Sequence, residues 1–172
     1  MKTAPPASRG RGSGRRIAGR AQLDHILDPY QAQHKPHEPT ACPQCGAIYH
    51  RGRWQWGRRP DAAHEAPCPA CRRIADGMPA GIVTVHPGST PELQAEMTGL
   101  VRNEEAAEKQ EHPLNRIISI DPSSDGGLSI STTDIHLPRR LGEALHRTYH
   151  GTLDMHFDEG GYFVRVDWRP PA

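Results

Sequence analysis

The sequence lacks any long apolar run. Only 35% of its 172 residues are hydrophobic, and its mean hydropathy is −0.72. No stretch approaches the roughly 18–20 consecutive apolar residues that a membrane-spanning helix needs. The first twenty residues, MKTAPPASRGRGSGRRIAGR, also lack the apolar core of a secretory signal peptide. These absences predict a cytoplasmic location without membrane contact, where thiols stay reduced.

Motifs of common enzyme chemistry are also missing. There is no Gly-x4-Gly-Lys-Ser/Thr phosphate loop, and GRGSGRR near the N-terminus is only a Gly/Arg-rich run. The eleven histidines are scattered and suggest no second metal site. The stretch HEAPC superficially resembles a zinc deaminase motif, but Glu65 follows His64 directly and Cys68 comes too soon. We therefore predict no catalytic residues and no small-molecule substrate.

Acidic residues are unevenly distributed along the chain. Residues 1–20 carry six basic side chains and no acid, a balance of +6. The segment 42–74 has six arginines against Asp61 and Glu65, a balance of +4. Residues 92–172 instead have eight basic and fourteen acidic side chains. The overall charge of +1 hides this gradient, which predicts polyanion contacts for the first half of the chain only.

Proline and glycine, 17 of each, indicate that part of the chain is disordered. Residues 1–40 are predicted to be a disordered basic tail and linker, with one short helix before Pro29. A cysteine-containing segment occupies residues 41–75. The turn-rich junction DGMPAG (76–81) then leads into a small α+β domain, residues 81–169.

Strand and helix patterns alternate in this second domain. Strands are predicted at 81–86, 116–121, 128–133, 152–158 and 162–168, the last two joined by the hairpin signal DEGG. One helix is predicted at 90–112, with Thr90 as N-cap, and a second from 135–137 to Gly151. The first helix is expected to have a solvated, charged second half. The residues expected to face the core are Leu93, Met97, Leu100 and Val101 in the first helix and Leu137, Leu141, Ala144, Leu145 and Tyr149 in the second. The order β-α-β-β-α-β-β predicts a ferredoxin-like fold with an added strand. This order of elements along the chain does not determine which strands pair with each other in the sheet.

All four cysteines of the chain lie in two Cys-x-x-Cys pairs, Cys42/Cys45 and Cys68/Cys71, separated by 22 residues. This spacing is a zinc signature, because two intervening residues let a tight turn direct both thiolates at one tetrahedral ion. Gly46 can adopt the positive φ that such turns need. Four thiolates leave no open position, so we predict a structural Zn²⁺ in a zinc ribbon, with the metal supplying about 10–16 kcal/mol toward folding.

Other uses of the four thiols remain open at this point. Two disulfides would suit an oxidising compartment, and a redox pair would need a single Cys-x-x-Cys in a βαβ context. An iron or iron–sulfur centre could use the same four ligands. His50 and His64 lie between the two pairs and could replace a cysteine as ligand, although both are expected on the surface.

The insert between the pairs is basic and aromatic. The predicted nucleic-acid contacts are Arg51, Arg53, Arg58, Arg59, Arg72 and Arg73. Arginine binds phosphate through paired hydrogen bonds and stacks on bases. Taken as one strand, IYHRGRWQW places Arg51 and Arg53 on one face and Trp54 and Trp56 on the other. The tryptophans are therefore predicted to form the core of the ribbon or to dock it on the α+β domain.

CPQCG and CPACRRI, followed at once by DGMPAGIVTVHPG, resemble the N-terminal zinc-binding region of the archaeal and eukaryotic large-ribosomal-subunit nuclear export adaptors. The chain is more similar to a family of short, uncharacterised bacterial proteins that share this ribbon. In these, as here, ISTTDIHLPRRLGEALHRTYHG precedes a VRVDW-like strand. The resemblance spans roughly residues 42–168. It implies zinc at the four cysteines and a ribosome or structured-RNA partner, but no export role, since bacteria have no nucleus.

These observations favour a non-enzymatic, zinc-stabilised protein that binds RNA or the ribosome, with DNA binding as a variant. The alternative is a protein–protein adaptor or stress-response regulator that uses the acidic α+β domain. A third hypothesis is that the protein is an enzyme. Catalysis would then need a pocket that contains titratable groups with shifted pKa values. The residues available for such a pocket are Asp134, His136, His146 and His150.

Overall fold

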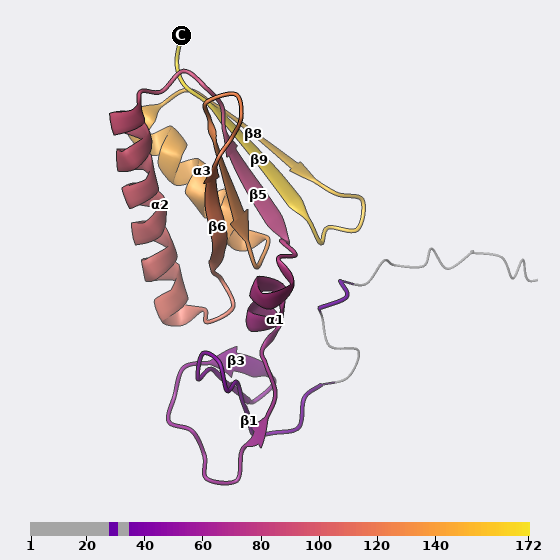
Figure 1. Cartoon of the computed structure of the whole chain (residues 1–172). Coiled ribbons are helices and arrows are strands. Elements are labelled where there is room, and N and C mark those ends of the chain that lie inside the picture. Colours follow the sequence, from indigo (N-terminus) through magenta and orange to yellow (C-terminus); the bar gives the residue numbers. More distant parts are fainter. Residues whose placement is uncertain (1–27, 31–34) are drawn as a thin grey trace, which may run out of the picture.

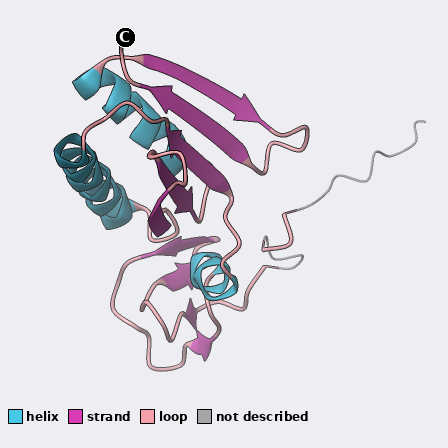
Figure 2. Ribbon diagram, turned by 45° about the horizontal axis from the view of Figure 1, so that its top comes forward, coloured by secondary structure: helices cyan, strands magenta, loops and turns pink. Residues whose placement is uncertain are grey.

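The structure is a computed structural model that describes residues 28–30 and 35–172. Two sheets and three helices give a mixed α+β architecture (Figures 1 and 2). Most of the predicted basic tail, including the short helix before Pro29, falls outside the described residues. Within the described ranges, none of the helices combines the length and apolar character needed to traverse a bilayer.

Residues 40–76, here called the cysteine module, form a small sheet followed by one helix. The strands are β1 (Thr40–Ala41), β2 (Ile48–His50), β3 (Arg53–Gln55) and β4 (His64–Glu65), in the spatial order β3-β2-β1-β4. Helix α1 (Pro69–Asp76) then leads toward the second sheet (Figure 1). Helix α1 was not predicted from the sequence. Its signals are Pro69 in the first turn and Gly77, whose φ of 62° ends the helix.

Residues 81–169, here called the two-layer unit, form a five-stranded sheet with two helices on one face (Figures 1 and 2). The strands are β5 (Gly81–Val85), β6 (Ile117–Pro122), β7 (Leu128–Thr132), β8 (Thr152–Phe157) and β9 (Val164–Arg169). The helices are α2 (Pro91–Glu111) and α3 (His136–Tyr149). The predicted element order is confirmed, and each element lies within two residues of its predicted bounds. Thr90 caps α2, as predicted, by accepting from the amide of Leu93.

Strand pairing in this unit follows the order β6-β7-β5-β9-β8. Strand β7 lies between β5 and β6 and is antiparallel to both, so that β5, α2 and β6 form a split β-α-β unit. On the other side, β9 pairs in parallel with β5, and β8 forms the edge. The chain therefore passes from α3 to the far edge before the hairpin returns it beside β5.

The core of the two-layer unit lies between the sheet and the two helices. Its fully buried residues include Val83, Val85, Met97, Val101, Leu137, Leu141, Leu145, Val164, Val166 and Trp168. The Trp168 indole N–H donates to the carbonyl oxygen of His150 at 2.7 Å, which satisfies its one polar atom. The predicted apolar stripes of α2 and α3 are confirmed. The second half of α2 is less solvated than expected, because Glu108 is buried and pairs with Arg140 at 2.8 Å.

Close packing of α3 on the sheet predicts opposite effects at two helical glycines. A Cβ atom on Gly142 would lie 2.5 Å from Val166 Cγ1 and 2.9 Å from Leu153 Cδ1, whereas one on Gly99 would meet nothing within 4 Å. We expect Gly142→Ala to lower the free energy of unfolding by about 1–3 kcal/mol through overpacking. Gly99→Ala, the matched control in α2, should raise it by up to about 1 kcal/mol through helix propensity. Urea unfolding followed by tryptophan fluorescence measures both, and a stabilised Gly142→Ala would contradict the packing.

Candidate metal centre

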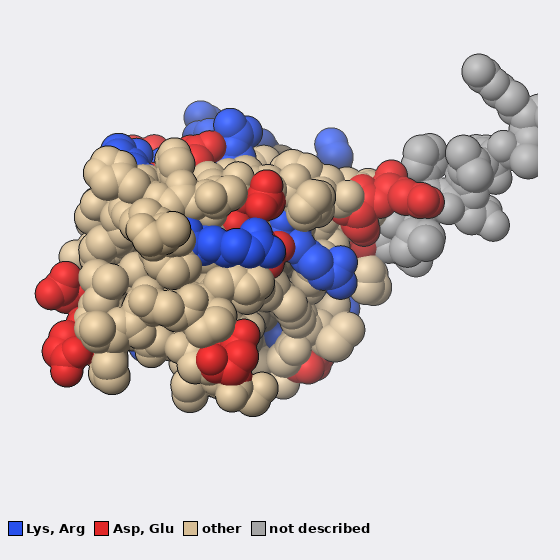
Figure 3. All heavy atoms as spheres, turned by 90° about the horizontal axis from the view of Figure 1, so that it is seen from above, with Lys and Arg blue, Asp and Glu red and all other residues tan. Residues whose placement is uncertain are grey.

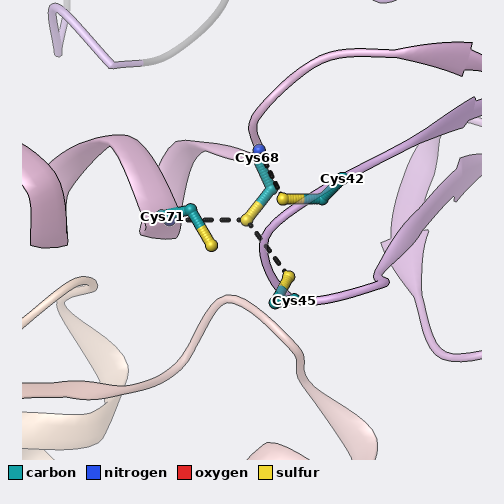
Figure 4. Close-up of side chains that lie close together, drawn as sticks. All are labelled: Cys42, Cys45, Cys68 and Cys71. Carbon is teal, nitrogen blue, oxygen red and sulfur yellow. Dashed lines mark hydrogen bonds between the residues drawn. The ribbon is translucent and has the colours of Figure 1, made fainter.

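The four cysteine sulfurs point toward a common centre (Figure 4). All four Sγ atoms lie within 4.8 Å of one another, and Cys45 Sγ is 3.7 Å from Cys68 Sγ. Zn–S bonds of about 2.3 Å in a tetrahedron would place the sulfurs about 3.8 Å apart. None of the four cysteines forms a disulfide. Their arrangement is therefore compatible with a metal site of four thiolate ligands.

Local structure directs each sulfur toward this centre. Cys42 and Cys45 lie in the turn after β1, which is closed by the Gly46 amide donating to the Cys42 carbonyl oxygen at 2.9 Å. Gly46 has the positive φ that was predicted, 78°. Cys68 caps α1, and its Sγ accepts from the amide of Cys71 at 3.4 Å. The amide of Cys68 in turn donates to Cys42 Sγ at 3.3 Å. Such N–H donors favour the thiolate form that binds metals.

Burial and N–H donors act in opposite directions on these thiols. Burial raises the pKa of the Cys68 thiol well above its usual range. Burial also acts to raise the pKa of the Cys42 thiol. Hydrogen bonds from the amides of Cys68, Cys45 and Gln44 outweigh this effect, and the pKa of Cys42 falls to about 7. A divalent cation among the four sulfurs would favour thiolates at every position, so that metal affinity falls as the pH falls.

The two-layer unit contributes one charged side chain to the cysteine cluster. Arg116, just before β6, is only 7% exposed, and its Nη2 donates to Cys71 Sγ at 3.2 Å and to Cys68 Sγ at 3.3 Å. Its amide is fixed by the Thr133 hydroxyl oxygen at 2.9 Å. Although burial opposes the charged form, the neighbouring Cys71 sulfur raises the pKa of Arg116. Sequence reasoning missed this residue, because a lone arginine before a strand carries no local signal.

Apolar and aromatic side chains complete the junction between the two parts. Trp54 of the cysteine module and Leu114 of the two-layer unit both pack against the cysteine cluster. The Trp56 indole N–H donates to the Lys109 carbonyl oxygen in α2 at 2.6 Å. Both predicted roles of the tryptophans are thereby confirmed: Trp54 supplies core to the module, and Trp56 docks it on the two-layer unit.

The predicted division of IYHRGRWQW into two faces is wrong in detail. The segment is a hairpin, since Arg51 and Gly52 form a two-residue turn with φ of 52° and 76°. Glu38 accepts both turn amides, at 2.7 and 2.9 Å, and these bonds lower the pKa of its carboxyl group. Tyr49 is consequently paired with Trp54, with ring centroids 5.6 Å apart.

Five of the six predicted nucleic-acid-binding arginines are exposed. These are Arg51 in the β2–β3 turn, Arg53 in β3, Arg58 and Arg59 in the following loop, and Arg72 in α1. Arg59 pairs with Glu65 at 2.5 Å. The other four form no ion pair with any residue the structure describes. They remain available to an anionic partner.

Arg73 is the exception, and its prediction as a phosphate contact is corrected here. The side chain is buried, and Nη2 pairs with Asp28 at 2.5 Å while Nη1 donates to the Met78 carbonyl oxygen. The Arg73 Cζ atom lies over the Tyr30 ring, 4.4 Å from the centroid of that ring. Arg73 lies three residues after the buried Ala70, so it shares the buried face of α1. Asp28 and Tyr30, within the segment predicted as tail, therefore contact α1.

Comparison with known proteins does not extend these observations. No protein-family model, curated protein or solved structure matches the chain.

The cysteine geometry predicts one bound metal ion per chain. Cys68→Ser should lose this ion, because a neutral serine cannot replace a buried thiolate at the centre of the cluster. His64→Ala is the matched control, since His64 lies between the two cysteine pairs but is exposed and outside the cluster. Elemental analysis of untagged protein measures zinc and iron together. Retention of the metal by Cys68→Ser, or its loss from His64→Ala, would contradict the ligand set.

The Arg116 contacts predict that this side chain strengthens metal binding. Residues that hydrogen-bond to metal ligands typically contribute a factor of about 10–100 in affinity. We expect Arg116→Met to weaken zinc binding by that factor and Arg116→Lys, which keeps the charge without the planar fork, to weaken it less. Competition with a chromophoric chelator measures the affinity. Arg102→Gln, an exposed arginine of α2, should leave it unchanged; equal loss at both positions would refute a specific role for Arg116.

Proposed function

We propose that the protein is a zinc-stabilised RNA-binding protein without catalytic activity, with the ribosome or another structured RNA as its partner. The observation that carries the proposal is the group of four exposed arginines on the cysteine module that form no ion pair with a described residue, Arg51, Arg53, Arg58 and Arg72. Arginine side chains that have no carboxylate partner are suited to phosphate oxygens.

Burial of the sulfurs supports a structural role for the metal. Cys42, Cys68 and Cys71 are 2%, 0% and 6% exposed, and Arg116 covers two of the sulfurs. A substrate would find no open coordination position on an ion held by four such thiolates. The metal would instead hold the β1 turn against the start of α1. It would thereby fix the arginine-bearing hairpin and helix relative to each other.

Charge pairing in the two-layer unit favours this proposal over an adaptor that uses the acidic surface. Glu104 and Glu108 of α2 pair with Arg140 and Arg147 of α3, and Glu143 pairs with Arg139. In the view from above, some basic and acidic side chains lie next to each other near the middle of the face, while other acidic groups at its left and lower edges stand apart (Figure 3). Several carboxylates of α2 and α3 are thus engaged by arginines within the protein, whereas four exposed arginines of the cysteine module form no ion pair with a described residue.

The proposal includes the finer assignments drawn from the sequence. Residues 41–75 would be a zinc ribbon domain, and residues 81–169 a ferredoxin-like variant in which the β8–β9 hairpin replaces the last single strand. The resemblance to the export adaptors and to the short bacterial family supports a ribosomal or structured-RNA partner. Free thiols fit the cytosol, where reducing conditions keep zinc ligands available.

Phosphate contacts predict a steep salt dependence of RNA binding. Each neutralised phosphate contributes about −0.7 to −0.9 to the slope of log affinity against log salt concentration. We expect a double substitution, Arg53→Gln with Arg58→Gln, to weaken binding of ribosomal RNA and to make this slope less negative by about 1.4–1.8. Arg102→Gln on α2 should change neither. Filter binding at several salt concentrations measures the slope, and an affinity that is flat in salt would refute the proposal.

A further inference from the structure

A cleft lies at the junction between the cysteine module and the two-layer unit. Its volume of about 950 Å³ is within the range of about 300–1,000 Å³ that small-molecule sites have. Tyr49, Arg53 and Trp54 of the β2–β3 hairpin line it, together with Arg72 of α1. The two-layer unit contributes the loops that precede β6, α3 and β9.

Charge in the cleft favours an anion. Lys35, Arg53 and Arg72 line it, are exposed, and form no ion pair with a described residue. Of the two carboxylates in the lining, Asp28 is engaged with Arg73. The other, Asp134, accepts the amides of His136 and Leu137 through Oδ2, at 2.7 and 3.1 Å. The cleft therefore carries uncompensated positive charge on the side of the cysteine module.

Besides its positive charge, the cleft has aromatic rings and a carboxylate oxygen that accepts no hydrogen bond from the described residues. Half-buried Trp54 and Tyr162 line the cleft beside the cationic side chains. Asp134 Oδ1 is buried and accepts no hydrogen bond from the described residues, and burial raises the pKa of this carboxyl group. A nucleobase combines a π face, which stacks on aromatic rings, with N–H donors that suit such an acceptor.

We propose that this cleft holds one unpaired nucleotide of the bound RNA strand. The proposal rests on the proposed function and narrows its ligand to single-stranded segments. The phosphate would lie against Arg53 and Arg72, and the base against the aromatic side chains. A base within a duplex is paired and stacked on its neighbours, so only an unpaired nucleotide can place its ring in the cleft.

The test compares single-stranded and duplex RNA. Zinc-loaded, full-length protein is titrated into a fluorescein-labelled eight-nucleotide RNA, alone or annealed to its complement, and anisotropy is followed at one salt concentration. We expect the single strand to bind more tightly than the duplex. Tyr162→Ala should weaken single-strand binding about 5–100-fold, the usual worth of one stacked base, and leave duplex binding unchanged.

Two control variants separate stacking from general effects. Tyr162→Phe keeps the ring and should retain single-strand binding. Arg58→Gln removes an exposed charge outside the cleft lining and should weaken single-strand and duplex binding by the same factor. A loss of binding in Tyr162→Ala that also appears in Tyr162→Phe would overturn the stacking role.

Three outcomes overturn the inference. Equal affinity for single strand and duplex, unaffected by Tyr162→Ala, would leave RNA binding intact but remove the nucleotide from the cleft. A free nucleoside monophosphate that binds as tightly as the eight-nucleotide strand would make the ligand a free nucleotide and not an RNA strand. Failure of the unmodified protein to bind either RNA would overturn both this inference and the proposed function.

Discussion

A buried guanidinium in contact with two thiol sulfurs joins the two parts of this protein. Arg116 belongs to the two-layer unit, yet its Nη2 lies against Cys68 and Cys71 of the cysteine module. A buried cation is costly unless an opposite charge is close to it. Thiolates would meet that need, and a bound dication would keep the four crowded thiols deprotonated. Metal binding at this cluster would therefore be thermodynamically coupled to the docking of the two parts.

The cysteine module needs this coupling, because its own core is very small. Its buried cluster consists of Cys42, Cys68, Ala70 and Cys71, with Trp54 and Leu114 packed against it. Leu114 comes from the two-layer unit, as does the carbonyl group that accepts from Trp56. The positions of the exposed arginines in β3, its flanking loops and α1 therefore depend on the metal centre and on the junction together.

Local patterns were sufficient to predict the helices and strands of the two-layer unit and the clustering of the cysteines, but they did not predict contacts between residues distant in sequence. Thr90 as a cap, the stripe through Met97 and Val101, and the Cys-x-x-Cys spacing are all short-range signals. The parallel pairing of β9 with β5 joins segments about eighty residues apart, and no local pattern encodes it. Arg116 and Arg73 were missed as buried residues for the same reason: their partners, Cys68 with Cys71 and Asp28, are more than forty residues away.

The charge asymmetry of the protein follows from how its carboxylates are engaged. In the cysteine module, Glu65 pairs with Arg59, and Asp76 accepts from the Tyr30 hydroxyl group. Glu38, just before it, is held by the turn amides instead of by an arginine side chain. These carboxylates are engaged in holding the fold together, so they leave several exposed arginines uncompensated. In α2 and α3, by contrast, carboxylates and arginines face each other across the helix pair. The availability of these arginines thus follows from the internal bonding of the module as well as from its composition.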